Sequence, residues 1–143
     1  MKFLIKVSCE ESEPLRSFLQ SQFPMAYVCI CGFDTLATEV LERADSVDRP
    51  FDFIIIDISF RRIDAFLNSG EREGLIEYYN ANRSRLEGKV IFLYGEEQNK
   101  KGIIEMFGEE KLKGISFFTT KSEKGDLPRI NREEIKNWLK EKI

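Results

Sequence analysis

The sequence contains no histidine among its 143 residues. This absence excludes the Ser-His-Asp and Cys-His pairs of nucleophilic enzymes, because both need an imidazole base. It also leaves a zinc site of the usual Cys and His kind short of ligands. Neither a GxxxxGK[ST] phosphate-binding loop nor a GxGxxG dinucleotide fingerprint occurs. We therefore expect a protein that is not an enzyme.

Long apolar runs and a surplus of basic residues are also missing. No stretch approaches the roughly 18 apolar residues that a membrane span needs, and the apolar run after Met1 is too short for a secretory signal. The net charge of −3 argues against a general nucleic-acid binder, which more often carries a basic face. We expect a cytoplasmic protein with reduced cysteines, whose partners are neither membranes nor nucleic acids.

Apolar segments with strand and helix spacing alternate along the chain, whose length fits one domain over residues 1–143. The strand-like segments are Phe3–Val7, Ala26–Cys31, Phe51–Ile58, Lys89–Leu93 and Ile115–Thr120. The helix-like segments are Glu10–Phe23, Leu36–Ala44, Glu73–Leu86, Lys100–Lys113 with a break expected at Gly108, and a last helix capped by Asn131. This (βα)5 pattern predicts an α/β fold with a doubly wound, parallel five-stranded sheet. The flavodoxin-like strand order 2-1-3-4-5 is among the few topologies left by right-handed crossovers.

The most strongly apolar strand, Phe51–Ile58, delivers Asp57 to the carboxyl edge of this sheet, where ligands of such folds bind. Glu10 and Glu11 follow the first strand and Lys121 follows the fifth, so acids from two strands and a lysine from a third are expected to meet there. Carboxylates that share a pocket repel one another unless a cation such as Mg²⁺ lies among them. A lysine opposite them suits a phosphoryl group, so the pattern favours phosphoryl transfer onto a carboxylate.

At these residues the sequence resembles a known family. The run Phe51-Asp52-Phe53-Ile54-Ile55-Ile56-Asp57-Ile58 resembles the third strand of response-regulator receiver domains, and Phe117-Phe118-Thr119-Thr120-Lys121 resembles their fifth. The resemblance implies a stand-alone receiver-like signalling domain in a two-component phosphorelay, with output by protein contact. The partner would be a histidine kinase, from which Asp57 accepts phosphate, or another signalling protein. Glu10, Glu11 and Asp57 would hold Mg²⁺. Lys121 would contact the phosphoryl group.

Several functional positions depart from the receiver pattern. Ser8 and Cys9 stand where the family has an acidic pair, Tyr94 stands where it has Ser or Thr, and Ser122 replaces the usual proline after the lysine. The loop Ser59–Arg72 is also several residues too long. These departures leave two alternatives open: a degenerate pseudo-receiver that binds partners without phosphorylation, and a regulatory module similar to the anti-sigma antagonist (STAS-type) family.

Two further expectations concern packing and partners. Cys29 and Cys31 share one face of a strand and are expected to pack in the core. The apolar face of the helix near Ile103–Phe107 is a candidate partner surface, and a homodimer through the last two helices is possible in such folds.

Overall fold

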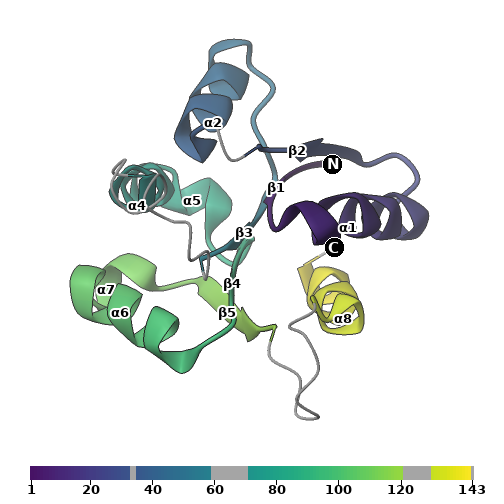
Figure 1. The fold of residues 1–143 in the computed structure, drawn as a ribbon. Helices are drawn as coiled ribbons and strands as arrows, with labels where there is room; N and C mark the ends of the chain where they lie inside the picture. The colour runs from purple at the N-terminus through teal and green to yellow at the C-terminus, as the bar shows by residue number, and fades with distance from the viewer. Residues whose placement is uncertain (33–34, 59–70, 121–129, 143) are drawn as a thin grey trace.

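The computed structural model describes residues 1–32, 35–58, 71–120 and 130–142, and these residues form one five-stranded sheet flanked by helices (Figure 1). The strands are β1 (Lys2–Lys6), β2 (Tyr27–Ile30), β3 (Phe53–Asp57), β4 (Val90–Tyr94) and β5 (Ile115–Thr119). Their order in the sheet is β2-β1-β3-β4-β5, and every neighbouring pair is parallel. The predicted fold class and strand order are therefore confirmed.

Helices cover both faces of this sheet, as Figure 1 shows. The helices are α1 (Cys9–Gln22), α2 (Ala37–Ser46), α4 (Glu71–Ala81), α5 (Arg83–Leu86), α6 (Glu97–Phe107), α7 (Glu109–Leu112) and α8 (Arg132–Lys142). Helices α1 and α8 lie on one side, which we call the α1/α8 face, and the others lie on the opposite side, which we call the α2/α4 face. None of the described helices is long and apolar enough to cross a bilayer.

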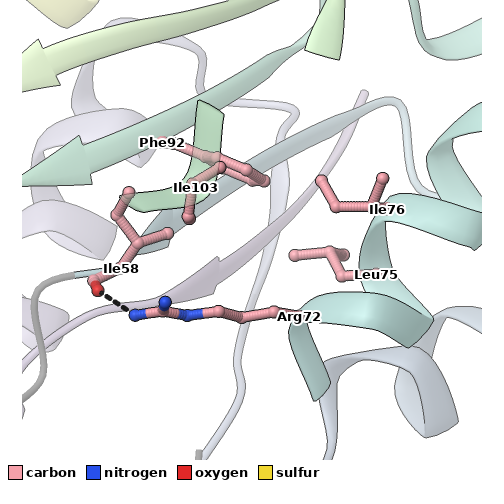
Figure 2. A pocket seen from close by; sticks show the side chains of 6 residues that line it. All are labelled: Ile58, Arg72, Leu75, Ile76, Phe92 and Ile103. Atoms are coloured by element: carbon pink, nitrogen blue, oxygen red, sulfur yellow. Dashed lines mark hydrogen bonds between the residues drawn. The ribbon is translucent and has the colours of Figure 1, made fainter. Parts of the chain in front are cut away.

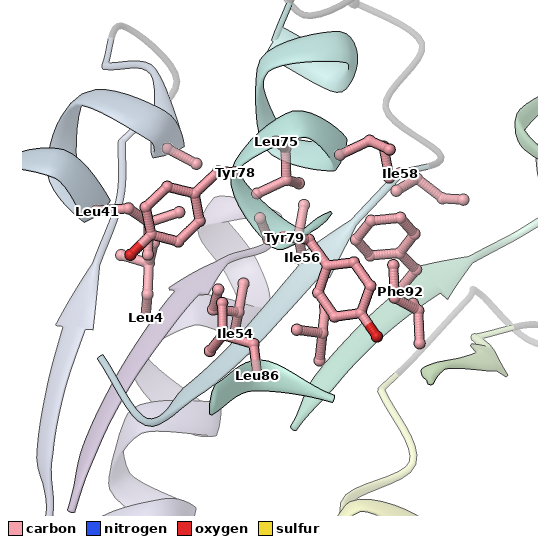
Figure 3. Close-up of a cluster of buried hydrophobic side chains, with 14 of the residues drawn as sticks. Leu4, Leu41, Ile54, Ile56, Ile58, Leu75, Tyr78, Tyr79, Leu86 and Phe92 are labelled. Carbon is pink, nitrogen blue, oxygen red and sulfur yellow. The ribbon is translucent and has the colours of Figure 1, made fainter. Parts of the chain in front are cut away.

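Alternate residues of the central strands pack into the two cores on either side of the sheet. In β1, Phe3 and Ile5 belong to the core on the α1/α8 face, whereas Leu4 belongs to the core on the α2/α4 face. Ile54 and Ile56 of β3 join the latter core (Figure 3). The near-continuous apolar character of β3 follows, because a parallel strand covered on both faces has no solvent-facing side.

The boundaries of the predicted helix Glu73–Leu86 differ in the structure. The helix predicted from Glu73 begins at Glu71 instead, and it ends at Ala81 before the short helix α5. Gly108 separates α6 from α7 with a positive φ of 84°, so the predicted break is confirmed. The predicted cap of the last helix is also confirmed, because the Glu134 N–H donates to the Asn131 side chain over 3.0 Å.

Candidate functional site

The last residue of β3, Asp57, lies at the carboxyl edge of the sheet, beside Leu93 of β4. Its side chain is half-buried. Phe53 and Ile55 pack on the α1/α8 face, and the period-two alternation of a strand therefore directs Asp57 toward the same face. Lys121, the predicted contact of a phosphoryl group, lies outside the described residues. The role of Asp57 as a phospho-acceptor stays a prediction.

The two acids that were predicted to hold Mg²⁺ with Asp57 occupy the first turn of α1. Glu10 is exposed, and Glu11 Oε2 lies 4.0 Å from Nη2 of Arg132 in α8. Across the described part of the chain, no three acidic or cysteine side chains are grouped so that they could hold a metal ion. The Mg²⁺ site that the receiver resemblance implies at Glu10, Glu11 and Asp57 stays a prediction.

The segment after β1 leads directly into α1 and brings no acidic pair to the strand end. Val7 is buried in the core on the α1/α8 face. The carbonyl oxygen of Ser8 accepts the first helical hydrogen bonds, from the N–H groups of Glu11 and Ser12, each over 3.0 Å. Cys9 is the exposed first residue of the helix. The residues at the end of β1 thus serve to start a helix.

The most heavily buried charges of the described chain belong to Lys6 and Glu71. Lys6 ends β1, and Glu71 begins α4. Nζ of Lys6 donates to both carboxylate oxygens of Glu71, over 2.9 and 2.8 Å, and to the Thr35 carbonyl oxygen over 3.0 Å. Both side chains are only 1% exposed. Buried charges are tolerated only when they are paired and hydrogen-bonded, and this pair meets both conditions.

Glu71 also caps the helix α2. Its Oε1 accepts the N–H of Ala37, the first residue of α2, over 2.8 Å. The N-cap residue Leu36 makes no side-chain hydrogen bond to this helix, so the carboxylate satisfies a backbone donor that the local sequence leaves open. A negative charge is also favourable at the positive end of a helix dipole. One carboxylate therefore joins β1, α2 and α4 at the carboxyl edge.

The thiol of Cys31 lies beside this ion pair. Its Sγ donates to the Thr35 carbonyl oxygen over 3.2 Å, the same oxygen that Lys6 contacts. Burial raises the pKa of Cys31 to about 11, although the nearby Lys6 ammonium acts in the opposite direction. A thiol in this state is inert at neutral pH. Cys31 and the half-buried Cys29 both pack in the core of the α2/α4 face, which confirms the predicted packing.

A guanidinium group closes the carboxyl end of β3 from the side of α4. Nη2 of Arg72 donates to the carbonyl oxygen of Ile58 over 3.0 Å, directly after Asp57 in the chain (Figure 2). Burial lowers the pKa of Arg72, and the neighbouring Glu73 carboxylate offsets part of this effect. An arginine in this setting keeps its charge at neutral pH.

Beneath Arg72 lies a cavity of only about 10 Å³. Its lining consists of Ile58, Arg72, Leu75, Ile76, Phe92 and Ile103 (Figure 2). This volume is about that of one water probe, and the lining is apolar except for Arg72. The cavity is therefore too small for a ligand such as a phosphate ester.

The sequence pattern does not indicate three residues of this edge. Lys6 lies within the predicted apolar strand Phe3–Val7, and the predicted loop Ser59–Arg72 includes Glu71 and Arg72, which the structure places in α4. One pattern in the sequence points to the ion pair. Lys6 lies two residues after Leu4 on the same strand, so its side chain is on the same face as Leu4 and points toward a core. A lysine is almost never fully buried unless it is paired, so this position predicts an acid nearby but does not say which.

The comparisons with known proteins identify no relative. No protein-family model, no curated protein and no solved structure matches the chain. The strand order and the alternating helices show a flavodoxin-like α/β fold, which is the arrangement that receiver domains also have.

Proposed function

We propose that this protein is a receiver-like regulatory module that acts by binding a protein partner, and that its carboxyl edge is not a Mg²⁺-dependent phosphorylation site. The buried pair of Lys6 and Glu71 is the observation that carries this proposal. It lies at the carboxyl end of β1, on the α2/α4 side of the switch point between β1 and β3, where a flavodoxin-like sheet normally opens to a ligand.

The contacts of Glu71 support a structural role for this carboxylate at the edge. A site that binds Mg²⁺ and a phosphoryl group needs carboxylates that are accessible to water and to the ion. Here the buried carboxylate of Glu71 is committed to an ammonium group and to a helix N-terminus. Any rearrangement that frees it would leave Lys6 unpaired in the core, which is strongly unfavourable.

Phosphorylation of Asp57 is the second candidate function. The favouring observation is the place of Asp57, which ends the strand next to β1 at the switch point. In that version a histidine kinase supplies the phosphoryl group and Lys121 contacts it. The anti-sigma antagonist-like alternative is disfavoured, because the helix α1 separates β1 from β2.

Incubation with Mg²⁺ and acetyl phosphate, followed by intact-mass measurement, tests the proposal. We expect no phosphoryl mass gain under conditions in which a known receiver domain is modified. Addition of Mg²⁺ is likewise expected to leave the thermal unfolding midpoint unchanged, since the described acids are not grouped around a cation.

The matched control is Asp57→Asn, which removes the acceptor and nearly preserves the shape of the side chain. A mass gain in the wild-type protein that is absent in Asp57→Asn would overturn the proposal in favour of phosphorylation. A gain that persists in the variant would place the modification elsewhere and would leave the proposed role of the edge intact.

A further inference from the structure

A groove of about 570 Å³ runs between α4 and the pair α6 and α7. Its lining residues are Glu73, Ile76, Glu77, Asn80, Met106, Phe107 and Lys111. The four residues from α4 recur at intervals of three and four, so they form one stripe along that helix. One face of α4 therefore lines one side of the groove.

The floor of this groove is apolar. Ile76 is buried and Phe107 is half-buried, whereas the side chain of Met106 is 57% exposed. Met106 and Phe107 end the helix that was predicted to offer a partner surface, but Ile103 of the same helix is buried in the core. The part of α6 that remains available for a partner is thus its last turn.

The two walls of the groove carry opposite charges. Glu73 and Glu77 are one helical turn apart on α4, and within the described ranges neither carboxylate takes part in an ion pair. Like charges at this spacing destabilise a helix. Lys111 lies on the opposite wall. An added cation along the α4 wall would relieve the repulsion.

Hydrogen bonds hold the two walls together in the absence of a partner. Nδ2 of Asn80 donates to the Lys111 carbonyl oxygen over 3.0 Å, and Nη2 of Arg83 donates to the Glu110 carbonyl oxygen over 2.6 Å. The groove is therefore preformed, which reduces the conformational entropy lost on binding.

We propose that this groove docks an amphipathic helix of a partner protein, whose apolar stripe covers Met106 and Phe107 and whose Lys or Arg side chains lie along Glu73 and Glu77. A helix with an apolar face is the ordinary occupant of an apolar groove between helices. This inference rests on the proposed function, since it assigns the surface through which the module binds its partner.

Two synthetic helical peptides test the charge complementarity. Both carry a leucine stripe; one has two lysines a turn apart along the edge of that stripe, and the other has two glutamates in their place. Titration into ¹⁵N-labelled protein is expected to shift the amide signals of residues 73–80 and 106–111, with about three- to tenfold tighter binding of the lysine peptide.

Protein variants make the test specific. The double variant Glu73→Lys/Glu77→Lys is expected to reverse the peptide preference, whereas Glu42→Lys/Glu141→Lys changes the net charge equally at exposed positions outside the groove and is expected to keep it. Met106→Gln, at a largely exposed position, is expected to weaken both peptides without unfolding the protein.

Three results would overturn the inference: binding of neither peptide, signal shifts that avoid the groove, or an unchanged preference in Glu73→Lys/Glu77→Lys. None of them bears on the acetyl phosphate experiment, whose readout is the mass of the protein. Failure of the groove and failure of the proposed function are therefore distinguishable.

Discussion

The two faces of the sheet differ in the kind of side chains that they bury. On the α1/α8 face, the rings of Phe3 and Phe53 stack with centroids 5.0 Å apart, and Trp138 meets Phe53 edge-on at 5.9 Å. On the α2/α4 face, the core also encloses the ion pair of Lys6 and Glu71. Aromatic packing is adaptable, whereas a buried ion pair tolerates only one arrangement of the elements that supply it.

Hydrogen bonds from two tyrosine hydroxyl groups add to this difference between the faces. The hydroxyl of Tyr78 donates to Asp45 Oδ2 over 2.7 Å, and that of Tyr79 donates to the Lys113 carbonyl oxygen over 2.5 Å, both on the α2/α4 face. These bonds attach α4 to α2 and to the segment before β5. The comparison teaches that one face contributes mainly apolar burial, while the other also fixes how its helices are placed.

Lys6→Met is expected to have the largest effect. The substitution keeps an apolar stem of similar length but leaves the Glu71 carboxylate buried without its cation. We expect a loss of about 3–5 kcal/mol in the free energy of unfolding, measured by urea denaturation. A loss below about 1 kcal/mol would show that the α2/α4 face does not depend on this pair.

The double variant Lys6→Met/Glu71→Gln is the matched control for that prediction. The glutamine oxygen can still accept the N–H of Ala37, and no charge is left in the core. We therefore expect the double variant to be more stable than Lys6→Met alone, which a double-mutant cycle would quantify.

Gly114→Ala is expected to follow in size. Gly114 has a φ of 89°, and an added Cβ would lie 2.5 Å from both the Tyr79 hydroxyl oxygen and Glu87 Cγ. The unfavourable backbone conformation and the displaced hydrogen bond together predict a loss of about 2–3 kcal/mol.

Gly102→Ala, on the same face of the sheet, is expected to change stability in the opposite direction from Gly114→Ala. Gly102 lies inside α6, and an added Cβ would meet nothing within 4 Å. We expect a gain of about 0.5–1 kcal/mol, because alanine favours a helix interior more than glycine does. Thermal unfolding of both glycine variants, compared with wild type, checks the two signs together.

Alkaline pH is expected to weaken the α2/α4 face selectively. Burial raises the pKa of Cys31 from 9.0 to about 11 and that of Tyr78 from 10.0 to about 12. At a pH between the unfolded-state and folded-state pKa values of either group, the unfolded chain has lost the proton of that group, whereas the native state retains it. The protonated Cys31 and Tyr78 therefore contribute their full stabilisation of the folded state below pH 9. This contribution falls as the pH rises from 9 toward 12, and most of it is lost above that range.

The two variants Cys31→Ala and Tyr78→Phe should each flatten the fall in stability over their own pH window. Denaturation series at increasing pH would measure the slopes. Leu139→Met, in the core of the α1/α8 face and removed from both groups, should leave the slope as in wild type. Equal slopes in all variants would contradict the assignment to these two groups.

Among the destabilising substitutions, Ile55→Val is expected to give the smallest loss. Ile55 is fully buried in the core of the α1/α8 face, and the substitution removes one methylene group. A loss of about 0.5–1.5 kcal/mol in urea denaturation is expected. A loss as large as that of Lys6→Met would remove the distinction between an adaptable face and a fixed one.

The fold was predictable because it depends on patterns that the chain repeats. The apolar run around Ile54–Ile56 and the alternation of strands with helices predict the parallel sheet and leave the observed strand order among a few topologies. The break at Gly108 and the cap at Asn131 were predictable from local residue chemistry.

The carboxyl edge was less predictable, because it depends on contacts between distant residues. Asp57 was found from the end of its own strand, but Lys6 and Glu71 are 65 positions apart, and no local pattern relates them. Arg72 was missed for a similar reason, since its hydrogen bond to Ile58 depends on where α4 begins. The local sequence around Glu71 is charged and resembles a loop, whereas the buried lysine on β1 pairs with Glu71 where the helix starts.

The separation of Lys6 and Glu71 along the chain has a consequence for folding kinetics. The ion pair can form only after β1, α2 and α4 have come together, so the entropy of closing a long loop is lost before the pair contributes. We therefore expect this contact to form late, after the folding transition state. Lys6→Met is therefore expected to accelerate unfolding and to leave the folding rate nearly unchanged, which the two arms of a chevron plot would separate.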